Sequence, residues 1–118
     1  MNRQALDASI IEELRQLSVD SDASFLANQI SLFSRRGRDS LAAMERAWSV
    51  SDPRALKSSA HALAGTAAVI GAMRLSEECL ALEERLVHGA IGPLQATLLT
   101  IRTAFLEAEG LLTEVMRE

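Results

Sequence analysis

Apolar side chains recur every three or four residues along nearly the whole chain, which is the period of an α-helix. The longest stripe runs from Leu26 through Gly37 to Trp48 without a phase slip, so it predicts one helix over about 22–49 rather than two. At 1.5 Å per residue this helix would be roughly 40 Å long. Gly37 costs it about 1 kcal/mol relative to alanine and predicts a bend or a close contact.

Shorter stripes on both sides of this helix predict four more. Leu6 to Leu17 predicts a first helix, broken at "SVDSD" (18–22), which supplies N-cap residues for the next. "SDP" (51–53) predicts a start with Ser51 or Asp52 as the cap and Pro53 in the first turn. That helix has its stripe on Leu56, Ala60, Leu63, Ala67 and Ile70, and Gly71 ends or bends it. Leu75, Cys79, Leu82 and Leu86 mark a fourth helix that closes at "HGAIGP" (88–93), and a fifth spans Leu94 to Val115.

Short connections make successive helices antiparallel neighbours. The pattern therefore predicts an all-α fold, an up-and-down antiparallel four-helix bundle with an extra short N-terminal helix. A chain of 118 residues fits a single domain over 1–118.

Composition and charge agree with a helical domain and exclude some partners. Aromatic residues make up only 3% of the chain, and net charge is −4. The only basic cluster, Arg35, Arg36 and Arg38, is short, so nucleic acid is not an expected partner. The single cysteine, Cys79, occupies a periodic apolar position and is expected in the core. No apolar run is long enough to span a membrane, and we expect a cytoplasmic location.

His61 is the residue whose surroundings suggest chemistry. It follows the core position Ala60, so we expect it beside the apolar stripe, at the edge of the buried face. Ala64, Gly65 and Ala68 share its face and leave the imidazole uncovered. A neutral imidazole is a nucleophile near neutral pH, and small neighbours let another protein approach it closely. The alternative for His61 is a partly buried structural histidine. The alternative for the small residues is close packing against a neighbouring helix.

The stretch "AHALAGTAAVIGAMRLSEECLALE" (60–83) resembles the signature of histidine-containing phosphotransfer (HPt) domains. That signature has A-H-x-L-K-G, four variable positions and [LIV]-G-A, followed by a leucine, a cysteine or similar residue, and L-E. "FLANQISLF" (25–33), Leu41 and "AWSVSD" (47–52) resemble the family's preceding helix. The similarity covers roughly residues 10 to 115.

This resemblance implies that His61 accepts a phosphoryl group on Nε2 from the aspartyl phosphate of a receiver domain and passes it to another receiver. It implies no metal or nucleotide on this domain, with Mg²⁺ on the receiver, and a docking surface at Lys57, Ser58, Ala64, Gly65 and Ala68. The chain departs from the family at Ala64, where a lysine usually stands. Arg35, Arg36 or Arg38 would supply the missing charge if helix packing aligned one of them with His61.

The sequence contains one further histidine and several carboxylates that could form a site. Glu83 matches the family and is expected to be structural or at the rim, and His88, at a helix end, is given no catalytic role. A di-metal bundle needs Glu-x-x-His pairs, and neither His61 nor His88 has a glutamate three residues before it. The carboxylates that could otherwise suggest such a bundle are Glu12, Glu13, Glu77, Glu78, Glu83 and Glu84.

The sequence leaves open two alternatives to a relay intermediate. One is a degenerate docking or dimerisation module that lost transfer along with its lysine. Another is a substrate domain of a kinase whose ATP-binding part lies elsewhere. The chain itself has no glycine-rich nucleotide motif, so autokinase activity is not expected. The sequence leaves open a free-standing protein or the cytoplasmic C-terminal domain of a hybrid sensor kinase in a membrane. A monomer is the simplest expectation, because the apolar stripes of the helices can cover one another within one chain.

Overall fold

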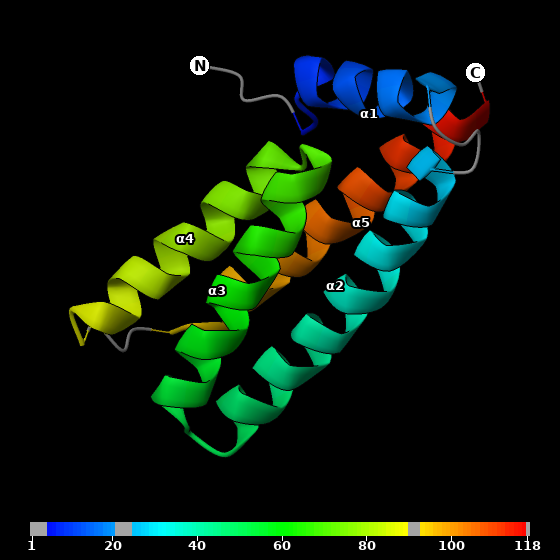
Figure 1. Ribbon diagram of the computed structural model, residues 1–118. Helices are drawn as coiled ribbons and strands as arrows, with labels where there is room; N and C mark the ends of the chain where they lie inside the picture. The colour runs from blue at the N-terminus through cyan, green and yellow to red at the C-terminus, as the bar shows by residue number, and fades with distance from the viewer. Residues whose placement is uncertain (1–4, 21–24, 90–92, 118) are drawn as a thin grey trace.

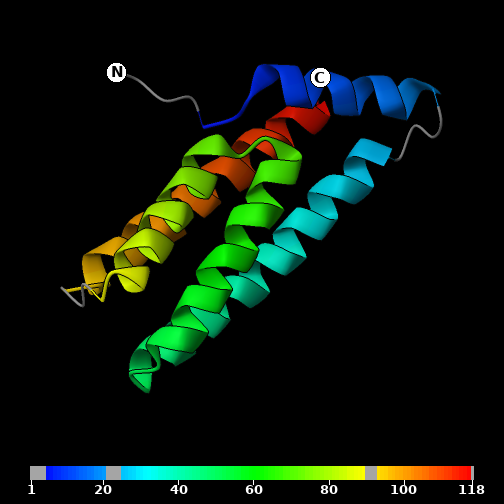
Figure 2. The same ribbon diagram turned by 60° about the vertical axis from the view of Figure 1, so that its left-hand side comes forward.

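The computed structural model describes residues 5–20, 25–89 and 93–117. Those residues form α1 (Ala8–Asp20), α2 (Phe25–Ser49), α3 (Pro53–Ile70), α4 (Met73–Val87) and α5 (Gln95–Arg117). Helices α2 to α5 run up and down as an antiparallel bundle, in which α3 contacts α2 and α4 while α5 closes the ring against the same two helices (Figure 1). Helix α1 lies across one end of the bundle (Figure 2). The predicted architecture is confirmed.

Helix α2 is continuous through Gly37, as predicted, and Gly37 marks a close contact. A Cβ placed on Gly37 would lie 2.2 Å from Cε1 of Phe105 on α5. The Phe105 ring is buried and stacks on Phe33, with ring centroids 5.2 Å apart. Glycine at position 37 therefore lets α2 and α5 approach closely enough to bury both rings.

Helix α3 begins and ends at the predicted signals. The Asp52 side chain accepts a hydrogen bond from the backbone N–H of Ala55 at 3.1 Å, so Asp52 rather than Ser51 is the N-cap, and Pro53 follows it. Gly71 ends the helix in the left-handed conformation, with φ +80°. Only two residues, Gly71 and Ala72, separate α3 from α4, so these two helices form a tight antiparallel hairpin.

Helix α1 extends further than predicted. The helix continues to Asp20, so the break expected at 18–22 begins later, and residues 21–22 lie outside the described part. Its start is capped by Asp7, whose carboxylate accepts from the side chain and backbone N–H of Ser9. These bonds, the side-chain one above all, hold the pKa of Asp7 below its usual range. The Asp7 N–H also donates to the Gly71 carbonyl at 2.7 Å, which ties α1 to the α3–α4 turn.

The core consists of most of the predicted stripe residues of the four bundle helices together with Ile11 and Leu14 of α1, while Leu17 of the predicted first stripe is exposed. On α3 three of the buried positions are alanines, Ala60, Ala64 and Ala67, which lets α2 and α4 pack close to the α3 backbone. Cys79 is fully buried, and this burial raises the pKa of its thiol to about 12. The prediction of Cys79 as a core residue is confirmed.

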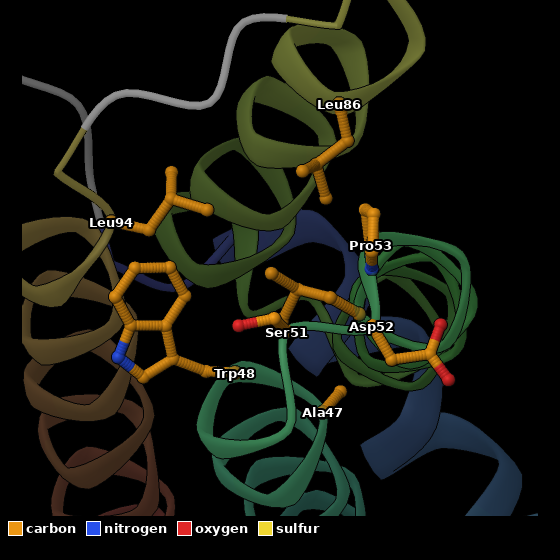
Figure 3. Close-up of a pocket in the computed structure, with 8 residues that line it drawn as sticks. Ala47, Trp48, Ser51, Asp52, Pro53, Leu86 and Leu94 are labelled. Atoms are coloured by element: carbon orange, nitrogen blue, oxygen red, sulfur yellow. The ribbon is translucent and has the colours of Figure 1, made fainter.

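The end of the bundle opposite α1 carries an apolar cleft of about 100 Å³. Figure 3 shows the indole of Trp48 beside Leu94, across from Leu86 and Pro53. Trp48 is half-buried there and is the only tryptophan of the chain, so its fluorescence reports on the packing of this end.

Candidate functional site

His61 lies in the middle of α3 with 71% of its side chain exposed. Ala60, one position earlier, is fully buried, while His61 has turned about 100° further around the helix and points outward. The imidazole is therefore further from the core than the edge position predicted from the stripe. The alternative of a partly buried structural histidine is wrong.

The imidazole of His61 is held by a carboxylate from the neighbouring helix. Nδ1 lies 3.1 Å from Oε1 and 3.0 Å from Oε2 of Glu83 on α4, whose side chain is 24% exposed. A carboxylate can only accept, so Nδ1 carries the proton and donates it. The lone pair of the neutral ring is then on Nε2, the nitrogen that Glu83 does not contact.

Glu83 lies at the partly exposed rim, as expected, and also contacts the imidazole of His61, which was not expected. A signal for this contact exists in the sequence. His61 and Glu83 lie eleven residues on either side of Ala72 (72 − 61 = 11 and 83 − 72 = 11), which sits in the α3–α4 turn. In a tight antiparallel hairpin, residues equidistant from the turn face each other. Periodicity alone predicted the two helices without giving their relative rotation.

The exposed residues of α3 around the imidazole form a flat surface, which we call the His61 face: Ser58, His61, Ala62, Gly65, Ala68 and Val69. Ser58, Gly65 and Ala68 are exposed, as a docking surface requires, and Lys57 lies half-buried at the border, while docking itself stays a prediction. Ala62 and Val69 were missed because an isolated alanine or valine carries no chemical signal. A Cβ added to Gly65 would meet no atom within 4 Å, so no contact in the described structure requires glycine there.

The placement of Ala64 on this surface was wrong. Ala64 is only 4% exposed, and its carbonyl oxygen accepts a hydrogen bond from the buried hydroxyl of Ser76 on α4 at 3.1 Å. For this residue the alternative of close helix packing is correct. The position where the family has lysine therefore lies here against α4.

The three arginines do not gather at His61. Arg38 is turned toward α5, where it pairs with Glu109 at 2.7 Å and lies over the Phe105 ring. Arg36 lies between α2 and α3 beside Thr66 and Val69, beyond the level of His61 along the helix. Arg35 is exposed. The condition for charge support, that packing aligns one of these arginines with His61, is therefore not met by Arg38 or Arg36.

The remaining candidates lie away from this surface. His88 ends α4, where its Nε2 is 2.8 Å from a Glu84 oxygen one turn earlier. Among the residues described, no three or more histidine, cysteine or acidic side chains gather as metal ligands would. The Trp48 cleft of Figure 3 opens near the start of α3 and does not include His61. Within the described ranges, none of the helices is long and apolar enough to cross a membrane.

Comparisons with known proteins show the fold and the family of this chain. The crystal structure of histidine-containing phosphotransfer protein B (HptB) from Pseudomonas aeruginosa PAO1 is similar, with a TM-score of 0.87 at 20% sequence identity. The match covers 98% of this chain and 97% of that one, and it shows the shared fold. No curated protein matches the chain. The family model for the Hpt domain matches residues 30–118, which include α3, α4 and both members of the His61–Glu83 pair. The chain belongs to the Hpt domain family, and its role is that of a histidine phosphotransfer protein in two-component signalling.

Proposed function

We propose that His61 is the phosphoacceptor of this domain, taking a phosphoryl group from the aspartyl phosphate of one receiver domain and delivering it to another. The observation that carries the proposal is the His61–Glu83 pair. It holds Nδ1 at 3.0–3.1 Å from the carboxylate and leaves Nε2 on a ring that is 71% exposed. A nucleophile oriented by a third group and open to a partner is the arrangement that covalent transfer requires.

In the forward step the lone pair of Nε2 attacks the phosphorus of the aspartyl phosphate. The new N–P bond forms as the P–O bond to the aspartate breaks, and the aspartate leaves as a carboxylate. The ring keeps its proton on Nδ1 and gains positive charge, which the carboxylate of Glu83 faces directly. Glu83 therefore orients the ring and stabilises the phosphoimidazolium, as a buried carboxylate does for the histidine of a catalytic triad. The reverse step transfers the group to the second receiver.

The His61 face supports docking because it brings the two backbones close together. Its residues next to the imidazole are serine, alanine and glycine, and the glycine has open space where a side chain would stand. Glycine inside a helix costs about 1 kcal/mol relative to alanine. Because no neighbour within the described structure requires Gly65, we attribute it to the approach of the receiver.

The charge of the phosphoryl group is met by the receiver in this proposal. Helix α3 carries no carboxylate, and its cations are Arg54 and Lys57, both on the N-terminal side of His61. The family lysine is absent at Ala64, so the domain adds little positive charge at Nε2 itself. We place the Mg²⁺ and the reactive aspartate on the receiver, and the transfer then needs only one copy of this chain.

The test is labelling by a phosphorylated receiver domain. We expect wild-type protein to acquire acid-labile, base-stable phosphate and His61→Gln to acquire none, with the same helical circular dichroism spectrum. His61 is exposed, so its replacement leaves the core unchanged. Label that persists in His61→Gln would contradict the assignment. A receiver that binds without transferring would favour the degenerate docking module.

Glu83→Gln measures the contribution of the carboxylate in the same assay. We expect transfer to slow by roughly tenfold to a hundredfold, the range for altering a group that orients a metal-bound histidine. Glu84→Gln is the matched control, because Glu84 is the next carboxylate on α4 but pairs with His88. Equal rates for the two variants would show that Glu83 has no part in the reaction.

A further inference from the structure

A small groove runs between α2 and α3 at the edge of the His61 face. Its free volume is about 80 Å³, and its floor is formed by the buried Phe33 and Ile70. Arg36 lines one wall from α2, and Thr66 and Val69 line the other from α3. Val69 also belongs to the His61 face, so the groove and that face are continuous.

The groove lies within reach of a protein docked over His61. Val69 is eight residues after His61, which is about 12 Å along the helix axis. A typical partner covers about 800 Å² on each side, which corresponds to a disc of roughly 16 Å radius. A receiver centred on His61 would therefore cover the groove as well.

The groove combines a cation that makes no ion pair within the described part of the chain with an apolar side chain that is exposed there. Arg38, Arg74 and Arg102 each pair with a glutamate of a neighbouring helix. Arg36 makes no ion pair with any described residue, and α3, which forms the opposite wall, contains no carboxylate. Val69 is 64% exposed. An unpaired guanidinium beside an exposed valine suits a partner surface on which a carboxylate adjoins an apolar side chain.

We propose that the Arg36 groove is a second docking subsite that selects among receiver domains, favouring those that present a carboxylate next to an apolar side chain. This inference rests on the function proposed for His61 and deepens it by naming a residue that chooses the partner. Arg36 takes no part in the chemistry, because it lies at the level of Thr66 and Val69 rather than of the imidazole.

Two phosphoryl donors separate docking from chemistry. Phosphoramidate is a small donor that needs no docking surface: the Nε2–P bond forms as the P–NH₂ bond breaks, and ammonia leaves. The second donor is a receiver domain, phosphorylated with acetyl phosphate, that labels the wild-type protein. Arg36→Ala is compared with Arg35→Ala, which removes the same charge from the neighbouring exposed position.

We expect phosphoramidate to label wild type, Arg36→Ala and Arg35→Ala at the same rate. With the receiver, Arg36→Ala should raise KM about tenfold with little change in kcat, the effect of losing one well-placed interface contact. Arg35→Ala should change KM less than twofold, and added salt should shrink the difference between the two variants.

Unchanged receiver kinetics in Arg36→Ala would overturn the subsite alone, since phosphoramidate would still show His61 to be reactive. Equal losses in Arg36→Ala and Arg35→Ala would also overturn it, because they would indicate a general field of positive charge. Absence of label on His61 from both donors would overturn the proposed function and this inference with it.

Discussion

Substitutions at Gly65 and Gly110 can distinguish an effect on stability from an effect on docking. Both are exposed glycines within helices, and a Cβ added to either would meet no atom within 4 Å. Only Gly65 lies on the His61 face, one turn after the imidazole. Glycine to alanine in an exposed helix interior stabilises by roughly 1 kcal/mol.

We therefore expect Gly65→Ala and Gly110→Ala to raise the free energy of unfolding by about 1 kcal/mol each. Gly65→Ala should also slow transfer from a receiver severalfold, because the added methyl stands where the partner backbone must approach. Gly110→Ala should transfer like wild type. Urea unfolding followed by Trp48 fluorescence gives the first quantity and receiver labelling the second. Normal transfer by Gly65→Ala would remove the argument that glycine serves docking.

At the residue scale the sequence placed His61, Ser58, Gly65 and Ala68 correctly on the surface but failed for Ala64. The angle between residues 64 and 61 puts them on neighbouring parts of one face, and periodicity cannot show that α4 covers one of them. The Ser76 hydroxyl that binds the Ala64 carbonyl belongs to that helix. Burial at the border of a helix face depends on the rotation of its neighbour.

At the scale of elements, the contact of α2 with α5 depends on the absence of a side chain at Gly37. Helix propensity alone would make Gly37→Ala stabilising, as at Gly65. The added Cβ would instead meet the buried Phe105 ring at 2.2 Å, and the stacked Phe33 limits where that ring can move. Overpacking of this kind typically costs about 1–3 kcal/mol.

We expect Gly37→Ala to lower the free energy of unfolding by about 2 kcal/mol, measured by urea unfolding. Gly110→Ala serves as control, since the same change on α5 without a neighbour should act in the opposite direction. A stabilised Gly37→Ala would show that α2 and α5 can separate at no cost.

The α3–α4 hairpin is the element that builds the site. Its two-residue turn at Gly71 and Ala72 was predicted as the end of a helix, and it also determines which residues of the two helices face each other. The cap signals at Asp52 and Gly71 are local, so sequence predicted them well. The pairing of His61 with Glu83 joins residues 22 positions apart and depends on how the helices pack.

On the scale of the whole molecule, α1 stabilises one end of the bundle and lies outside the family match at 30–118. Its Ile11 and Leu14 are buried, and Asp7 fastens it to the α3–α4 turn. The family's signature residues all lie outside α1. We therefore expect substitutions in α1 to change the stability of the domain without changing the rate of phosphoryl transfer.

Leu14→Ala should lower the free energy of unfolding by about 2–3 kcal/mol, the lower part of the range for truncating a buried leucine. At temperatures where the variant is folded, labelling of His61 should match wild type. Glu13→Ala, at an exposed position of α1, should change neither quantity. Slower transfer by folded Leu14→Ala would place α1 in contact with the receiver or with the site.

The sequence by itself determined the helices, the cap signals of α3, most of the core positions and the exposure of His61. These follow from a 3.6-residue period and from residues that act on their immediate neighbours in the chain. Tertiary structure decided that Glu83 contacts His61, which their equal spacing from Ala72 only suggests in the sequence. It also decided that α4 covers Ala64, that Phe105 needs Gly37, and that Arg36 and Arg38 turn to different helices. Each of these depends on the rotation and spacing of two packed helices. Those quantities are set by all the side chains between the helices together, and no stretch of the sequence contains them.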